Sequence, residues 1–479
     1  MTLHPPQATE HQRSSPVDGS VTWQGDWAGQ TSIDRASMRA RGAFQRWAST
    51  TLQERCEVAN RYAVFLNANL EALSRTITLE SGKPLWESRT EVQSSIAKVN
   101  NATEAIRGRR WLQNEETLNQ TAIRYKPLGV MLVLGPYNLP LHLPGAHIVP
   151  ALLAGNTVLF KPSENSPAVG DWIAQAWMAA GAPSGVVEVF HGAAEQAKYA
   201  VSLANTAGVL FTGSYRAGIQ LHCQLAGRPE CILALEMGGN NPLVIDRIQN
   251  RKAAIATIIQ SAYITSGQRC TCARRIILVD CAENRNLIGE LSQSISKIHV
   301  GDPLSHPQPF MGTLVSEQAA QSILAAQDNM LALGAIPLNC ITILNHQSSM
   351  LSPGLLEVPK ALLADEEFFG PLATVQWVRN MDQAIEVANQ TKYGLAASLL
   401  SDDQSIYEQF VLRVNAGIVN WNAPTTGASG RLPFGGLGAS GNHRPSGFFA
   451  SDYCSDPVAS VQNRQLEQSA TLPPGLELI

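Results

Sequence analysis

The 479-residue sequence has no long apolar run, no cluster of basic residues and no leader-like N-terminus. The longest clear apolar run covers residues 130–134, whereas about 20 apolar residues are needed to cross a bilayer. The net charge is −4, and the absence of basic runs argues against nucleic acid or a membrane surface as a partner. Because no basic segment precedes an apolar core, we expect no secretory signal.

The eight cysteines follow no framework pattern, since they are scattered at positions 56, 223, 231, 270, 272, 281, 340 and 454. Cys270 and Cys272 are separated by one residue, whereas zinc knuckles usually have two residues between their cysteines. We therefore expect no bound metal and a reducing cytoplasm as the location.

The length exceeds one ordinary hydrophobic core, so we expect two or three domains. Charged residues make up 15% and hydrophobic residues 44%, which favours a globular chain over a disordered one. Residues 1–30 are predicted to form a loose polar lead-in. Residues 107–124 are polar and basic, and we interpret them as an excursion from the domain, such as a strand arm.

Two helices are predicted before residue 107. Thr51-Leu-Gln-Glu54 is a capping box, and it predicts the start of a helix whose apolar stripe continues to Ile77. Gly82 and Pro84 are expected to end this helix. A further polar helix is predicted over residues 91–106.

Beyond residue 127 the pattern changes to short apolar runs roughly 25 residues apart, with helical segments such as 167–180 between them. Ser166 is the expected N-cap of that segment, and Gly181 its stop. This alternation predicts a doubly wound parallel sheet and hence an α/β fold. The predicted strands cover residues 130–134, 157–160, 186–190, 209–211 and 232–235.

Polar residues follow these strands, at the edge where a doubly wound sheet binds its ligand. They are Asn138, Lys161, Glu164, Gly213, Ser214 and Glu236. No Gly-x-Gly-x-x-Gly fingerprint is present, but residues 211–218 run from a strand into a helix. Gly213 and Ser214 there would leave backbone amides free for a phosphate. The alternative is an ordinary glycine turn followed by a serine cap.

Cys270 lies in the run Ser266-Gly-Gln-Arg-Cys-Thr-Cys272, downstream of Leu235-Glu-Met-Gly-Gly-Asn240. A thiol in a glycine-containing loop, together with a carboxylate elsewhere, supplies a nucleophile and a base for water. The alternative is that Cys270 is one of several buried thiols, as most cysteines are.

Seven ordered blocks, spread over roughly residues 15–465, resemble those of the aldehyde dehydrogenase superfamily. Glu236 and Cys270 lie 34 residues apart (270 − 236), as in the family's glutamate and cysteine signatures. The blocks are Pro136-Tyr-Asn-Leu-Pro140, Lys161-Pro-Ser-Glu164, Phe211-Thr-Gly-Ser214, Leu235-Glu-Met-Gly-Gly-Asn-Asn-Pro242, Gly267-Gln-Arg-Cys270, Glu367-Phe-Phe-Gly-Pro371 and Pro433-Phe-Gly-Gly436.

The resemblance implies oxidation of an aldehyde to a carboxylate, with NAD as cofactor. Cys270 would attack as a thiolate, Asn138 and the Cys270 amide would hold the oxyanion, and Glu236 would activate water for thioester hydrolysis. Lys161 and Glu164 would hold the adenosine ribose, and Glu367 the nicotinamide ribose. The cofactor-binding residues implied by the resemblance are Lys161, Glu164, Gly213, Ser214, Tyr215, Arg216, Ala217, Gly218, Glu367 and Phe369.

Narrower features, such as Leu139-Pro-Leu-His-Leu-Pro144 and Gly438-Ala-Ser-Gly-Asn-His-Arg-Pro445, resemble the branch that oxidises a dicarboxylate semialdehyde in arginine catabolism. Cations near the substrate are then expected, and the candidates are His142, Arg269 and Arg444. Two departures stand out: the N-terminus lacks the short aromatic strand that opens most members, and residues 425–431 differ from the branch. Arg431 could contact an anion or narrow the access.

The resemblance divides the chain into a dinucleotide-binding domain (1–106 and 127–237) and a catalytic domain (238–445). An oligomerisation arm (107–126 and 446–465) and a tail (466–479) complete it, and a homodimer or dimer of dimers is expected. Three alternatives stay open: a dehydrogenase of another amino-acid-derived semialdehyde or of aldehydes in general, an enzyme that passes its acyl group to coenzyme A, and a catalytically silent protein. Glu236 argues against the second, and the intact Cys270, Glu236 and Asn138 argue against the third.

Overall fold

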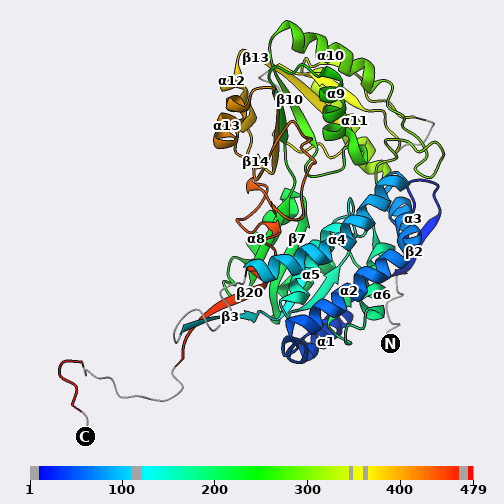
Figure 1. Cartoon of the computed structure of the whole chain (residues 1–479). Helices are drawn as coiled ribbons and strands as arrows, with labels where there is room; N and C mark the ends of the chain where they lie inside the picture. The colour runs from blue at the N-terminus through cyan, green and yellow to red at the C-terminus, as the bar shows by residue number, and fades with distance from the viewer. Residues whose placement is uncertain (1–9, 110–120, 345–348, 360–364, 463–472, 478–479) are drawn as a thin grey trace.

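The computed structural model describes residues 10–109, 121–344, 349–359, 365–462 and 473–477, in two α/β parts and a projecting arm (Figure 1). Residues 1–9 of the predicted lead-in, 110–120 of the predicted arm and most of the predicted tail lie outside this range. Within it, no helix combines the length and apolar character needed to cross a membrane. All eight cysteines are free thiols.

The first part contains a five-stranded parallel sheet in the order β6-β5-β4-β7-β8. Its strands are β4 (Val130–Leu134), β5 (Thr157–Lys161), β6 (Val187–Val189), β7 (Thr206–Gly213) and β8 (Ile232–Met237). All five predicted strands are therefore confirmed, with small shifts of their ends. The helices that accompany the sheet are α5 (His142–Leu153), α6 (Pro167–Ala179), α7 (Ala194–Ser202) and α8 (Tyr215–Leu225).

Four helices precede the sheet: α1 (Gln30–Ala48), α2 (Leu52–Ala68), α3 (Leu70–Ser81) and α4 (Leu85–Arg109). The capping box at Thr51 is confirmed. The single helix predicted from there to Gly82 is wrong, because the chain breaks at Asn69, whose carboxamide donates to the carbonyl of Phe65 (2.8 Å). The polar helix predicted over 91–106 is longer at both ends.

The predicted loose lead-in is also wrong, because residues 10–26 form an antiparallel hairpin of β1 (Glu10–Ser14) and β2 (Val21–Asp26). Gly19 (φ 73°) lies in its turn. Arg13 fixes the hairpin by donating to the carbonyls of Glu80 and Val315 (2.8 Å each). An opening strand with an aromatic side chain, Trp23, is thus present after all.

The second part is a seven-stranded sheet in the order β11-β12-β13-β10-β9-β15-β16, parallel except for β11 at its edge. Its strands are β9 (Asn241–Ile245), β10 (Ala273–Val279), β11 (Ile336–Asn339), β12 (Gly354–Glu357), β13 (Leu372–Val378), β15 (Ala396–Leu400) and β16 (Ile418–Trp421). Its helices are α9 (Arg251–Tyr263), α10 (Ala282–Ile295), α11 (Glu317–Ala332), α12 (Met381–Asn389) and α13 (Gln404–Arg413).

The chain passes between the two sheets in three residues, 238–240, which leave the carboxyl end of β8 and enter the amino end of β9. This short connection places the carboxyl edge of the first sheet opposite the amino edge of the second. The loop before β10, which carries Cys270, therefore faces the polar residues that follow β4, β5, β7 and β8.

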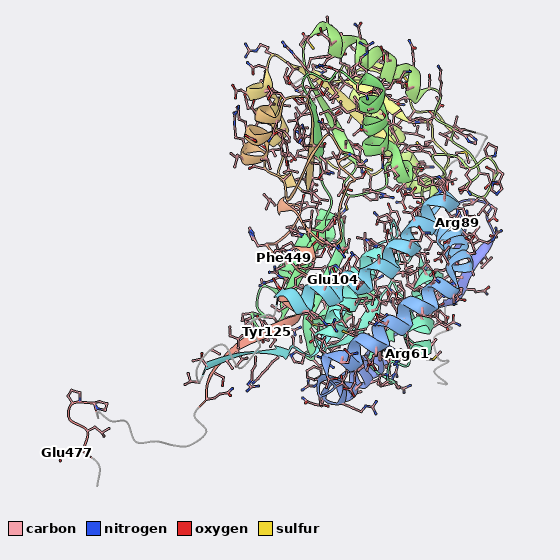
Figure 2. All side chains as sticks on the ribbon, viewed as in Figure 1. Arg61, Arg89, Glu104, Tyr125, Phe449 and Glu477 are labelled. Carbon is pink, nitrogen blue, oxygen red and sulfur yellow. The ribbon has the colours of Figure 1, made fainter. Side chains whose placement is uncertain are left out.

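The projecting arm pairs β3 (Thr121–Pro127) with β20 (Ser455–Val461), antiparallel and in register (Figure 1). Tyr125 lies on β3, and Phe449 lies just before β20 (Figure 2). Two short antiparallel strand pairs precede β20 in the sequence. They are β14 (Tyr393–Gly394) with β18 (Leu437–Gly438), and β17 (Pro433–Phe434) with β19 (Ser446–Gly447).

Asn156 connects the base of this arm to the first sheet. Its buried carboxamide accepts from the amides of Leu128 (2.7 Å) and Gly129 (3.0 Å), and donates to the carbonyls of Ala151 (3.1 Å) and Cys454 (2.7 Å).

We expect Asn156→Ala to lower the melting temperature by about 5 °C or more, because buried backbone groups lose their partners. Differential scanning fluorimetry measures this, with exposed Asn100→Ala as control. Equal melting temperatures for both variants would contradict the role.

Candidate active site

Two cavities meet at Cys270. The larger, of about 480 Å³, opens along the carboxyl edge of the first sheet, and the smaller, of about 170 Å³, lies beside α4. Leu143, Cys270 and Phe434 line both. The thiol can therefore meet one ligand from each side. Among the described residues, no group of three or more His, Cys, Asp or Glu is placed to hold a metal ion.

The loop before Cys270 makes an unusual left-handed turn at Thr265 (φ 57°), Ser266 (φ 51°) and Gly267 (φ 73°). Such conformations cost non-glycine residues about 1–3 kcal/mol each, so contacts elsewhere must hold them. A Cβ on Gly267 would lie 2.0 Å from the carbonyl oxygen of Gly370, and glycine is required there.

Glu87 of α4 stabilises this turn through hydrogen bonds. Its buried carboxylate accepts hydrogen bonds from the Thr265 hydroxyl and from Arg269 Nη2 (2.6 Å). Arg269 Nε also donates to the Thr265 hydroxyl (2.7 Å). The three side chains form a closed network, and it fixes the turn that presents Cys270.

The glutamate and cysteine motifs are joined directly by Asn241 at the start of β9. Its Nδ2 donates to the carbonyls of Cys270 (2.6 Å) and Cys272 (2.9 Å), and its Oδ1 accepts from the Ala396 amide (3.0 Å). Arg274, fully buried, donates to the carbonyls of Gly267 (2.7 Å) and Arg269 (3.1 Å). The backbone on both sides of the thiol is thus fixed.

Asn138 contacts the same loop from the first sheet, because its Nδ2 donates to the carbonyl of Gln268 (2.9 Å). Its own carbonyl accepts from Lys83 Nζ (2.8 Å), and Lys83 forms a buried ion pair with Glu91. The Cys270 amide donates to no acceptor within the described part of the chain. The Asn138 carboxamide and the Cys270 amide, which were predicted to hold the oxyanion, therefore lie at the same loop.

Glu236 is buried at the end of β8. Its Oε1 accepts from the Ser446 amide (3.0 Å), while its Oε2 has no partner among the described residues. Burial raises the pKa of Glu236 to about 8. Burial also raises the pKa of Cys270 to about 12, with smaller contributions from the carboxylates of Glu367 and Glu236. The resting thiol is therefore protonated at neutral pH.

The larger cavity holds most of the predicted cofactor residues. Lys161, Glu164, Gly213, Ser214, Ala217, Glu367 and Phe369 line it. Tyr215, Arg216 and Gly218 lie in the first turns of α8 without lining it. Gly218 instead packs against β8, since a Cβ there would lie 2.3 Å from Met237 Sδ. Ser214 caps α8 by accepting from the Ala217 amide (3.3 Å), as expected of the turn.

The deeper end of this cavity is shaped by Glu367. Its half-buried carboxylate accepts from the Gly239 amide (3.2 Å), and desolvation raises the pKa of Glu367 to about 7. A Cβ on Gly238 would lie 1.8 Å from Glu367 Oε2, so only glycine admits the carboxylate here. Phe369 contacts Tyr137 edge to face, at 6.1 Å between ring centroids.

The three predicted anion-binding residues have different positions. His142 and Arg269 line the smaller cavity, but burial holds the pKa of His142 far below its usual value and Glu87 neutralises Arg269. Arg444 is exposed and lines neither cavity, so the structure does not bring it to the site. Arg431 pairs with Glu104 of α4 (3.2 Å), which is labelled in Figure 2, and lines neither cavity.

The sequence interpretation missed the face of α4 that lines the smaller cavity: Glu87, Glu91, Ser94 and Lys98. Their spacing of four, three and four residues is that of one helix face. The sequence analysis predicted only a polar helix here, because a polar face that lines a cavity and one that faces solvent have the same residue pattern.

Known proteins match nearly the whole chain. The model of the Aldehyde dehydrogenase family matches residues 4–457. N-succinylglutamate 5-semialdehyde dehydrogenase of Chromohalobacter salexigens is 46% identical over 472 residues, which are 98% of this chain and 96% of that protein. The enzyme of the same name from Escherichia coli K12 is 45% identical over 473 residues, with the same coverage.

Solved structures agree with this match. An indole-3-acetaldehyde dehydrogenase in complex with NAD+ has a TM-score of 0.89 at 27% identity, over 94% of this chain and 92% of that one. An NAD-dependent aldehyde dehydrogenase from Sinorhizobium meliloti has a TM-score of 0.90 at 25% identity, over 98% and 95% of the two chains.

The contact between Gly238 and Glu367 gives a test of the larger cavity. We expect Gly238→Ala to displace the Glu367 carboxylate and to weaken NAD binding about tenfold or more, as measured by isothermal titration calorimetry. Gly289→Ala is the control, because a Cβ there meets nothing within 4 Å. Unchanged affinity in Gly238→Ala would show that Glu367 does not shape the cofactor site.

Proposed function

This chain belongs to the aldehyde dehydrogenase family, and we propose that it oxidises N-succinylglutamate 5-semialdehyde to N-succinylglutamate with NAD, in arginine catabolism. The position of Cys270 between two cavities carries the reaction type, because one cavity suits a dinucleotide and the other a small aldehyde. Relatives with 45–46% identity over 98% of the chain support the substrate.

The larger cavity fits NAD. The backbone amides of the first turn of α8 have no preceding helical turn to accept their hydrogen bonds, so this end of the helix favours a phosphate. Alanine and leucine side chains of α7 and α8, such as Ala197 and Leu221, give an apolar wall for the adenine. Lys161 and Glu164 (3.6 Å apart) can hold the adenosine ribose, and Glu367 the nicotinamide ribose.

We assign the chemical roles as follows. Cys270 loses its proton and attacks the aldehyde carbon, and the oxyanion accepts hydrogen bonds from the Asn138 carboxamide and the Cys270 amide. NAD, when bound, would accept the hydride that leaves the carbon attached to Cys270, and this loss would convert the thiohemiacetal into a thioester. Glu236 then takes a proton from the water that cleaves the thioester. Its unpartnered Oε2 is the free acceptor that this step requires.

A transfer of the acyl group to coenzyme A is disfavoured by this buried carboxylate, because a base for water would hydrolyse the thioester first. Cys270, Glu236 and Asn138 line the same cavity, and their presence there argues against a catalytically silent protein. We also propose that the sheet of β3 and β20 is the oligomerisation arm of a homodimer or dimer of dimers, and that the enzyme is cytoplasmic.

The substrate assignment is tested with a panel of aldehydes and NAD, followed by NADH absorbance. We expect the highest kcat/KM with N-succinylglutamate 5-semialdehyde, by about tenfold or more over hexanal. Equal kcat/KM values would leave a general aldehyde dehydrogenase. Cys270→Ala is expected to abolish turnover of every member of the panel.

The two-step chemistry predicts different results for the two reactive groups. Glu236→Gln should give one burst of NADH per active site and then stall at the thioester, whereas Cys270→Ala gives none. In the unmodified enzyme, thioester hydrolysis should rise with pH through about 8, because the raised pKa of Glu236 keeps part of the base protonated below that pH. Rapid-quench kinetics measure both. A Glu236→Gln variant that binds NAD without a burst would overturn the assigned role.

A preference for NAD over NADP is expected from Glu164. Its carboxylate can accept from the ribose 2′-hydroxyl, whereas a 2′-phosphate would bring about −1.5 to −2 charges against it. We predict a preference of about tenfold or more in kcat/KM, and Glu164→Ser should narrow it mainly by improving NADP. Comparable efficiencies in the unmodified enzyme would contradict the contact.

A further inference from the structure

Four charged side chains line the smaller cavity, and three of them are already paired. Glu87 pairs with Arg269 (2.6 Å), and Glu91 forms a buried ion pair with Lys83, which lies outside the lining. The fourth is Lys98, which has no hydrogen bond or ion pair with any described residue. These pairs cancel in charge, so Lys98 gives the cavity its net positive charge.

Lys98 is buried, with 8% of its surface exposed. A buried cation without a partner is costly, and burial accordingly lowers the pKa of Lys98 to about 8. Glu236 of β8 opposes this effect through its charge. On the other side, α5 presents His142 and His147, both with pKa values lowered by burial and by the Lys98 charge, and neither supplies a counterion.

We propose that Lys98 binds a carboxylate of the substrate and is the residue that selects anionic aldehydes. This inference rests on the proposed function, since it names the contact that the dicarboxylate semialdehyde would make. An arriving carboxylate gives Lys98 the partner that the protein does not provide, so part of the cost of burying the cation is recovered on binding.

His142 offers a second contact for the same group. Its Nδ1 is buried without a hydrogen-bond partner among the described residues, and the side chain lines the same cavity as Lys98. A neutral imidazole with its proton on Nδ1 can donate to the second carboxylate oxygen. Lys98 and His142 come from different elements, α4 and α5, and Cys270 lies in the lining of the same cavity.

A competing role for Lys98 is that of a counterion for Glu236. The two roles differ in what a neutral variant does. Loss of a counterion would slow thioester hydrolysis for every aldehyde and so lower kcat without regard to substrate charge. Loss of a carboxylate contact would raise KM for anionic aldehydes and affect uncharged ones far less.

The test is Lys98→Met in the full-length enzyme, with steady-state kinetics for N-succinylglutamate 5-semialdehyde and for its uncharged dimethyl ester. We expect kcat/KM for the acid to fall at least 30-fold more than for the ester, mostly through KM, and Lys98→Arg to restore part of it. Lys252→Met, at an exposed position of α9, is the matched control and should behave as the unmodified enzyme. Melting temperatures confirm that each variant folds.

Equal losses for acid and ester, or no loss for either, would overturn the proposal. Failure of the proposed function is a separate outcome, in which the unmodified enzyme does not prefer the succinylated semialdehyde. The variant is then compared on 4-oxobutanoate and butanal, which differ mainly in the carboxylate. A selective loss on 4-oxobutanoate supports Lys98 as a carboxylate contact, and equal losses overturn it.

Discussion

The carboxamide of Asn241 is the interaction on which the site depends. Asn241 is the first residue of β9, and only three residues separate it from the end of β8. Its carboxamide donates to the carbonyls of Cys270 and Cys272, so it joins the glutamate and cysteine motifs. The same side chain accepts from the amide of Ala396 at the start of β15, so the backbone at Cys270 is fixed to two strands of the second sheet. The strained turn at Thr265 and Ser266 can persist because its far end is held in this way.

Burial governs the chemistry of the groups so placed. Glu236, Glu367 and Cys270 all have raised pKa values, and desolvation is the largest cause in each case. The protein buries Glu236, partly buries Glu367 and Cys270, and gives each carboxylate at least one backbone amide, from Ser446 or Gly239. Such an environment leaves proton acceptors that titrate near neutral pH, as general bases require.

The parallel strands could be predicted because short apolar runs are local signals, and the residues proposed to react were chosen from motifs that are local as well. Other features depend on tertiary contacts. The apolar stripe of residues 58–77 continues in phase across Asn69, so periodicity could not show the break. The strands of the N-terminal hairpin have few buried side chains, and their order comes from Arg13 binding carbonyls of α3 and residue 315. The buried polar face of α4 resembles a solvated face until its ion pairs are seen.

The hydrogen bond between Glu236 and Ser446 joins residues 210 positions apart. At translation rates of about 5–20 residues per second, Ser446 is added on the order of ten to forty seconds after Glu236. During that interval the first sheet can form, because all its strands precede residue 238, but the end of β8 lacks its closing partner. In a nascent chain the end of β8 therefore stays without this partner until the last tenth of the protein is made.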